Sequence, residues 1–292
     1  MRVKGHIIWI FLLTLLLTDC GKQRPQDMSL EQSNSVYYWR TDLRLDSTEL
    51  AFLQRYHINK VYCRYFDVVM NENDPEPKPN ATISFSDNLP DNIELIPTIY
   101  ITEDCMRQNH QGLAERIVKR ILQMNETNDI RPVSEIQIDC DYTLKSRKTY
   151  YQFLKEVKHA WGKTLSTTIR LHQLSMEAPP VDYGVLMIYN TGDPRKWEER
   201  NPILDIRDVQ PYLRHLDSYP LPLAAAYPVY QWVRNIHQIR VEHSVDADEI
   251  LRVKAVVEKA RSNLGNAIIT YHLDHDNINR YKPKTYEEIY HH

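Results

Sequence analysis

Glycine is scarce in this chain of 292 residues: only seven occur, and none belongs to a G-x-G-x-x-G or G-x-x-x-x-G-K run. Loops that cradle a dinucleotide or a triphosphate need those glycines, so a bound nucleotide is not expected. We expect no cofactor. An excess of basic charge is also missing, because the net charge is −3 with mixed signs. A nucleic-acid partner would require a strongly basic face, so we expect none.

Cysteine is the next scarce residue, with four in the chain. If Cys20 is the lipidated residue of a processed chain, three cysteines remain: Cys63, Cys105 and Cys140. An odd number excludes a fully paired disulfide framework, and no C-x-x-C spacing indicates a metal or redox site.

The first residues have the pattern of an export signal. Arg2 and Lys4 precede an apolar run over 7–17 that is too short to span a bilayer comfortably. The run ends at Cys20, and this end resembles a bacterial lipoprotein processing site, although Asp19 stands where a small residue is usual. We therefore expect a signal peptide over 1–19, lipid on Cys20, and a polar tether over 20–35. The lipid would make the membrane a partner and place the protein in the cell envelope, on a periplasmic or outer-membrane surface. An uncleaved anchor is the alternative.

The remaining residues, 36–292, predict one (β/α)8 barrel domain of TIM type. Strand-like segments alternate with helical patterns along the chain, and residues 71–92, rich in Pro, Asn and Asp, are expected to form a loop. The strands are expected at 36–41, 60–69, 95–102, 135–143, 165–174, 183–190, 222–232 and 266–274. The helices are expected at 46–56, 113–124, 147–161, 206–217, 246–264 and 285–290.

The segment 134–143 has the most informative alternation in the chain. Its apolar positions, from Ile136 to Tyr142, share one face, which suits packing against helices. The other face carries Glu135, Gln137, Asp139 and Asp141. Two neighbouring carboxylates should have different proton affinities, which makes Asp139 and Asp141 a candidate acid/base pair. A strand with a solvated polar face is the alternative.

Polar side chains recur where the other predicted strands end. The carboxyl ends of barrel strands form the working face of such a fold, so this recurrence predicts a site there rather than a solvated rim. Arg170 should share a strand face with Thr168 and His172 and should pair with Asp139 or Asp141 on the adjacent strand. The candidate substrate-binding residues are Arg64, Asp67, Gln137, Arg170, His172, Asn190, Trp39, Trp232 and His272.

Two motifs resemble those of chitinase-like glycoside hydrolase barrels, which carry D-x-x-D-x-D-x-E on the fourth strand and M-x-Y-D on the sixth. The segment Gln137-Ile138-Asp139-Cys140-Asp141 aligns with the end of the first motif, with Gln for Asp and Asp for the final Glu. The segment Met187-Ile188-Tyr189-Asn190 aligns with the second, with Asn for its Asp, and Ser134 replaces the first Asp of the fourth-strand motif. The resemblance implies that Asp141 donates a proton, while Asp139 and Tyr189 orient a substrate acetamido group.

The chain is more similar to uncharacterised bacterial (Bacteroidetes-type) barrel lipoproteins whose fourth strand reads Gln-Ile/Leu-Asp-x-Asp and whose fifth begins Leu-Ser-x-Thr. That resemblance covers most of the chain after residue 35 and implies a fold and a site location, but no substrate.

These features favour a surface-anchored glycoside hydrolase with Asp141 as general acid, assisted either by a substrate acetamido group that Asp139 orients or by Asp139 itself acting on water. In such an enzyme, aromatic residues such as Trp39, Trp232 and Tyr189 would stack on sugar rings. Its partner would be a carbohydrate. One alternative is a non-catalytic carbohydrate-binding barrel. Another is a metal-dependent hydrolase using Asp139, Asp141, His172 and His272, which we rank lower because the first strand lacks a His-x-His pair and no ligand set has short spacing; no metal is therefore expected.

Overall fold

The computed structural model describes residues 29–71, 74–107, 111–193, 199–236 and 239–291. The predicted signal peptide, Cys20 and the first part of the tether lie outside these residues. Within the described part of the chain, no helix has both the length and the apolar character needed to cross a membrane.

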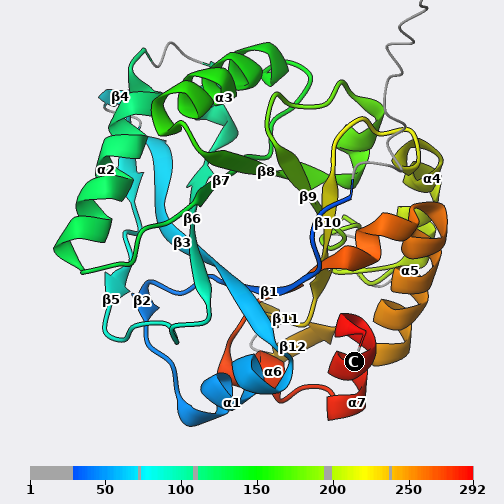
Figure 1. The fold of residues 1–292 in the computed structure, drawn as a ribbon. Coiled ribbons are helices and arrows are strands. Elements are labelled where there is room, and N and C mark those ends of the chain that lie inside the picture. Colours follow the sequence, from blue (N-terminus) through cyan, green and yellow to red (C-terminus); the bar gives the residue numbers. More distant parts are fainter. Residues whose placement is uncertain (1–28, 72–73, 108–110, 194–198, 237–238, 292) are drawn as a thin grey trace, which may run out of the picture.

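Eight parallel strands close into a barrel, as the sequence predicts, and helices surround it (Figure 1). Pairing between β1 and β3 closes the ring. Around the barrel the strands are β1 (Ser33–Tyr38), β13 (Ala267–Tyr271), β10 (Leu223–Pro228), β9 (Tyr183–Met187), β8 (Thr164–Arg170), β7 (Glu135–Asp139), β6 (Glu94–Ile101) and β3 (Ile58–Asn71). All eight start on one face of the barrel, and their carboxyl ends form the opposite face, which we call the mouth.

The helices begin and end close to the predicted limits. Asp46 starts the first one with a capping box, because its side chain accepts from the backbone of Thr48 and Glu49 while Glu49 reaches back to the Asp46 N–H. The helices are α1 (Ser47–Arg55), α2 (Leu113–Thr127), α3 (Arg147–Trp161), α4 (Ile206–Leu216), α5 (Ala247–Ala260), α6 (His275–Ile278) and α7 (Pro283–Tyr290).

Two β/α units have no α-helix in the described residues. After β3, where a loop was expected over 71–92, the chain forms β4 (Asp74–Asn80) antiparallel to β3, and then β5 (Ser84–Phe85), which pairs with β2 (Asp42–Leu43). Prolines at 77 and 79 are tolerated in β4 because it is an edge strand. After β8, the 3₁₀ turn η3 (Leu171–Ser175) takes the place of the predicted end of the strand.

The seventh predicted strand, 222–232, is two elements. β10 ends at Pro228, and an antiparallel hairpin of β11 (Gln231–Ile236) and β12 (Ile239–Ser244) follows on the mouth side. Trp232 therefore lies in this hairpin and not in the barrel wall.

Side chains of β7 are buried on both faces of the sheet, although they alternate as expected. Ile136 and Ile138 belong to the hydrophobic core. Gln137 lies on the inner side, where its amide bonds to Tyr37 on β1 and Ser166 on β8. The inside of this barrel thus holds polar groups where aliphatic layers are usual.

Candidate active site at the barrel mouth

Asp139 is the last residue of β7, so the predicted strand over 135–143 is four residues too long at its carboxyl end. The chain then turns, with the Tyr142 N–H donating to the Cys140 carbonyl at 2.9 Å. As a result Asp139 is buried, whereas the Asp141 side chain is 49% exposed. The expectation that both carboxylates project from one strand face is wrong, but both lie at the mouth.

Asp139 is buried and bonds to a neighbouring residue on β8. The Thr168 hydroxyl donates to Asp139 Oδ1 at 2.6 Å. Burial raises the pKa of Asp139 to about 6; the Arg170 cation opposes this rise and the Asp141 charge adds to it. Asp139 can therefore hold or release a proton near neutral pH.

Arg170 pairs with Asp141, which confirms the contact predicted from the adjacency of their strands. The Nε of Arg170 donates to Oδ1 of Asp141, and the Arg170 side chain is only 18% exposed. Burial lowers the pKa of Arg170, but the charges of Asp141 and Asp139 raise that pKa by more than burial lowers it. The net change is upward, so Arg170 stays a cation.

Gln173 ties together the two chain segments that carry this ion pair. Its side-chain oxygen accepts from the Arg170 N–H at 2.8 Å, and its Nε2 donates to the Tyr142 carbonyl at 3.0 Å. A fully buried glutamine with both ends bonded fixes the end of β8 against the turn after β7. Sequence reasoning missed it because nothing in the local pattern distinguishes it.

A pocket of about 340 Å³ opens beside Asp141 at the mouth. His172 borders it from η3 and not from a strand, which corrects the expectation that it shares a strand face with Arg170. Burial and the Arg170 cation lower the pKa of His172, which favours the neutral imidazole. The pocket is lined by Asp141, Arg170, Leu171, His172, Met187, Tyr189, Asn190, Thr191 and Tyr212.

Tyr189 presents a buried hydroxyl that has no hydrogen-bond partner among the described residues. Its ring stacks on Tyr271, with centroids 5.0 Å apart. Beside it, Asn190 has φ +52° and its side-chain oxygen accepts from the Tyr230 hydroxyl. An unpaired buried hydroxyl is energetically unfavourable, and it is available to a ligand.

The other side of the mouth carries a second ion pair. Arg64 Nε donates to Asp67 Oδ1 at 2.7 Å, and the Arg64 guanidinium lies over the Trp39 ring, 5.6 Å from its centroid. Trp39 in turn contacts Tyr271, with centroids 5.7 Å apart. The predicted residues Arg64, Asp67 and Trp39 are therefore together, around an aromatic residue that the sequence analysis did not select.

Three other predicted residues lie apart from the pocket lining. Gln137 is fully buried in the barrel interior. Trp232 is in the β11–β12 hairpin next to Tyr230. His272 follows β13; burial lowers its pKa, and its Nε2 lies 3.3 Å from Asn277 Nδ2, while its buried Nδ1 has no partner within the described chain.

Tyr271 lies at the carboxyl end of β13, next to the predicted residue His272, but its residue type alone does not distinguish it from a packing residue. It contacts Tyr37, Trp39, Tyr189 and Tyr230 at centroid distances of 5.0 to 5.7 Å. Burial raises the pKa of Tyr271, with Asp139 adding to the rise. Its phenol thus lies within electrostatic reach of Asp139.

The ligand set of the metal-dependent alternative is not assembled. In the residues that the structure describes, no three His, Cys, Asp or Glu side chains are grouped so that they could hold a metal ion. The structure describes three cysteines, Cys63, Cys105 and Cys140, which are buried and form no disulfide bond.

Comparison with known proteins gives matches in structure but not in sequence. No protein-family profile matches the chain, and no curated protein matches it by sequence. A chitinase from Bacteroides thetaiotaomicron is similar in structure at a TM-score of 0.57 and 10% identity, over 89% of this chain and 97% of that one. A GH113 β-1,4-mannanase matches at 0.53 and 9% identity, over 90% and 98%. The cellulose synthase subunit Z of Clostridioides difficile matches at 0.52 and 6% identity, over 89% and 99%.

At these identities the likeness establishes the barrel fold, over nearly the full length of each neighbour.

Proposed function

We propose that the protein is a glycoside hydrolase that acts on a glycan at the barrel mouth, with Asp141 as the proton donor to the leaving oxygen. The observation that carries the proposal is the pair of carboxyl groups at the end of β7, Asp139 as its last residue and Asp141 in the turn that follows. Asp139 is buried with a pKa of about 6, and Asp141 opens onto a pocket of about 340 Å³. Two carboxyl groups in different environments are what glycoside hydrolysis uses. The chitinase and mannanase named among the structural neighbours support the same class.

Asp141 must exchange one partner before it can act as an acid. Its Oδ1 accepts from Arg170, so that oxygen is not available to a glycosidic oxygen while the ion pair lasts. Asp139 is a second carboxyl group whose charge acts on Arg170. We propose that a bound sugar moves Arg170 toward Asp139 and frees Asp141 to hold and donate a proton.

The remaining groups of the mouth would bind and orient the sugar. Tyr189 offers its unpartnered hydroxyl, and with Asp139 it would orient a substrate acetamido group. Trp39 and Tyr271 present aromatic rings at the mouth, suited to stacking on sugar rings. His172 and Asn190 line the pocket and would bond to sugar hydroxyls.

The test is a screen of glycans for cleavage and binding by the purified protein. Oligosaccharides of β-1,4-linked N-acetylglucosamine and of mannose are the first probes, followed by a broad panel. The proposal predicts cleavage that Asp141→Asn removes. Cleavage at the wild-type rate by that variant would exclude Asp141 as the acid.

A second candidate, a non-catalytic carbohydrate-binding barrel, is favoured by the ion pair itself. An Arg170 that stays on Asp141 keeps a carboxylate at the mouth as a hydrogen-bond acceptor and never a proton donor. Binding without cleavage across the whole panel would support this candidate.

We also propose that the protein is exported and anchored by lipid on Cys20. The basic start, the short apolar run and Cys20 at its end support this location. Processing at Cys20 and membrane partition test it separately from the activity.

A further inference from the structure

A column of four polar side chains fills the barrel interior below the mouth: Tyr37, Gln137, Ser166 and Glu135, which we call the interior column. The Tyr37 hydroxyl donates to Gln137 Oε1 at 2.9 Å. Gln137 Nε2 donates to Ser166 Oγ at 3.4 Å, and Ser166 Oγ donates to Glu135 Oε1 at 2.6 Å. All four side chains are buried. The column therefore links the mouth to the opposite face of the barrel.

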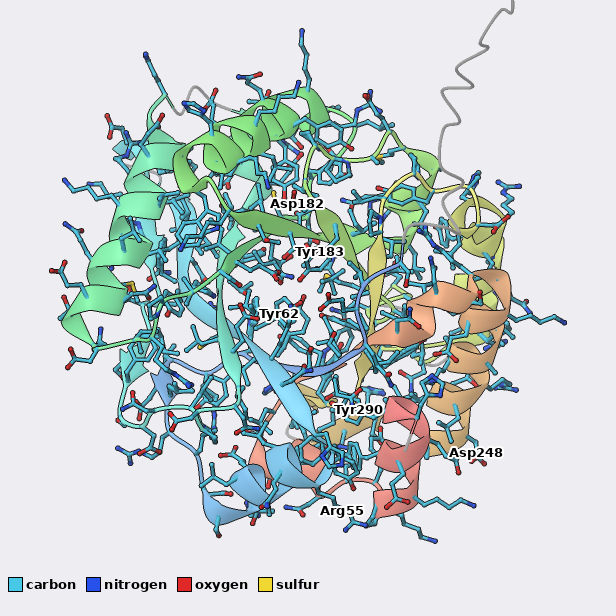
Figure 2. All side chains as sticks on the ribbon, viewed as in Figure 1. Arg55, Tyr62, Asp182, Tyr183, Asp248 and Tyr290 are labelled. Atoms are coloured by element: carbon cyan, nitrogen blue, oxygen red, sulfur yellow. The ribbon has the colours of Figure 1, made fainter. Side chains whose placement is uncertain are left out.

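Glu135 forms the lower end of the column, on the face away from the mouth. It also accepts from the Tyr183 hydroxyl, and Lys60 Nζ lies 3.6 Å from its Oε2. Tyr183 contacts Tyr62 through their hydroxyls at 2.6 Å, and Figure 2 shows both residues within the ring of strands. Burial raises the pKa of Glu135, while Ser166, Tyr183 and Lys60 favour its charged form.

An ionised Glu135 sets the direction of every bond above it. A carboxylate only accepts, so the single proton of Ser166 is committed to Glu135. Ser166 Oγ can then only accept from Gln137, which turns the amide nitrogen down and the amide oxygen up toward Tyr37. The hydroxyl proton of Tyr37 consequently points to Gln137.

Tyr37 forms the upper end of the column, next to the residues of the mouth. Its ring lies 5.8 Å from that of Trp39 and 5.6 Å from that of Tyr271, centroid to centroid. Burial raises the pKa of Tyr37, and the Asp139 charge raises it further. Gln137 and Asp139 lie two residues apart on β7 and share one face of that strand, so the Tyr37 hydroxyl that bonds to Gln137 lies on the face that also carries Asp139.

We propose that Glu135 is a positioning residue for the mouth: by fixing Ser166 and Gln137, it keeps the Tyr37 proton directed away from Asp139. Without that constraint, the Tyr37 hydroxyl would be free to donate toward the Asp139 carboxylate and stabilise its charged form. The inference rests on the proposed function only for its consequence in catalysis, because the column itself exists with or without turnover.

The test measures the titration of the Asp139 carboxyl by ¹³C NMR, with its signal assigned from Asp139→Asn. Ser166→Ala keeps the Glu135 charge but cuts the column, so Gln137 can turn over. The Asp139 midpoint should then fall by roughly half to one pH unit, as expected for a new hydrogen bond to a carboxylate. Gln137→Met removes the acceptor of Tyr37 directly and should give the same shift if the first variant does not fold.

Tyr183→Phe is the matched control. It removes the second hydroxyl group that donates to Glu135, but leaves the interior column intact. Its Asp139 midpoint should equal that of the wild type. In the double variant Tyr37→Phe/Ser166→Ala, the shift caused by Ser166→Ala should disappear, since the proton that produces it is gone.

Apart from Tyr37, the titratable and charged groups near Asp139 are unchanged in these variants. They are Arg170 on β8, Cys140 and Asp141 after β7, Asp67 on β3, Tyr100 on β6, Tyr150 on α3, Tyr189 after β9 and Tyr271 on β13. Equal midpoints in wild type and Ser166→Ala, or a shift that persists without the Tyr37 hydroxyl, would overturn the inference. A glycan screen without cleavage would instead count against the proposed function and leave the NMR result standing.

Discussion

Arg170 and Asp141 lie 29 residues apart in the chain, yet the Arg170 Nε donates directly to the Asp141 carboxylate at the barrel mouth. The pair joins the end of β8 to the turn after β7, and Gln173 holds both segments in place. The half-exposed carboxylate of the proposed acid thus begins in contact with a mostly buried cation. Whether Arg170 leaves Asp141 when a sugar binds is the point that separates a hydrolase from a binding protein.

Asp141→Asn should abolish turnover while the fold and sugar affinity change little. Asparagine keeps the shape of aspartate but cannot deliver a proton, so we expect a loss of roughly 100-fold or more in kcat. Asp139→Asn should also reduce kcat, and the two losses should not add, because both groups serve one step. Asp91→Asn, at a fully exposed carboxyl, is the control and should retain the wild-type kcat.

Arg170→Gln should raise the pKa of Asp139 above its wild-type value of about 6. The Arg170 cation lowers that pKa, whereas burial and the Asp141 charge raise it. A neutral amide at position 170 would remove the lowering effect and leave the two raising effects in place. Carboxyl titration by ¹³C NMR measures the midpoint. Arg131→Gln, at an exposed arginine on the opposite face, should leave it unchanged. A fall in the midpoint of Arg170→Gln would contradict the described electrostatics.

The difference in stability between Asp139→Asn and wild type should shift in favour of the variant as the pH rises. The folded-state pKa of Asp139 is raised from 3.8 to about 6, so its contribution to stability is fully present below about pH 4 and is lost as the pH rises through 6. That change corresponds to about 3 kcal/mol in the free energy of unfolding. Urea unfolding at pH 4 and pH 7 measures the difference between the variant and wild type. A difference that does not grow with pH would contradict the prediction.

Cys20→Ser should release the protein into a soluble fraction or leave an unprocessed precursor. Lipid on Cys20 is the expected attachment, and serine cannot be lipidated in its place. Membrane fractionation and the mass of the mature N-terminus check the result. A mature N-terminus at another residue, with the same membrane partition, would rule out this anchor.

The eight strands could be predicted from the sequence because each is a short apolar or alternating run between turn residues. Their ends could not. β7 stops at Asp139 and β8 stops at Arg170. Gln173 accepts from the Arg170 N–H at the end of β8 and donates to the Tyr142 carbonyl in the turn after β7, and the second contact spans 31 residues. Local patterns do not contain such contacts, so the alternation was extended too far in both strands.

The candidate site could also be predicted only in part, because some of its contacts follow from the barrel topology and others do not. The contact between Arg170 and Asp141 followed from the adjacency of two parallel strands, which a barrel guarantees. Tyr271 was missed because a tyrosine in a strand is equally suited to packing, and only the contacts with Trp39 and Tyr189 distinguish it.

The missing helix after β3 follows from a proline-rich segment that pairs along the edge of β3 instead.

The position of β1 determines how the molecule can be held. Because Ser33 begins a parallel strand, the chain enters the barrel on the face opposite the mouth, where the Tyr290 hydroxyl donates to the Ser35 carbonyl. The residues ahead of 29 therefore join the described chain on the side of the barrel away from the mouth. A protein held through that end has its attachment point and the pocket beside Asp141 on opposite faces of the barrel.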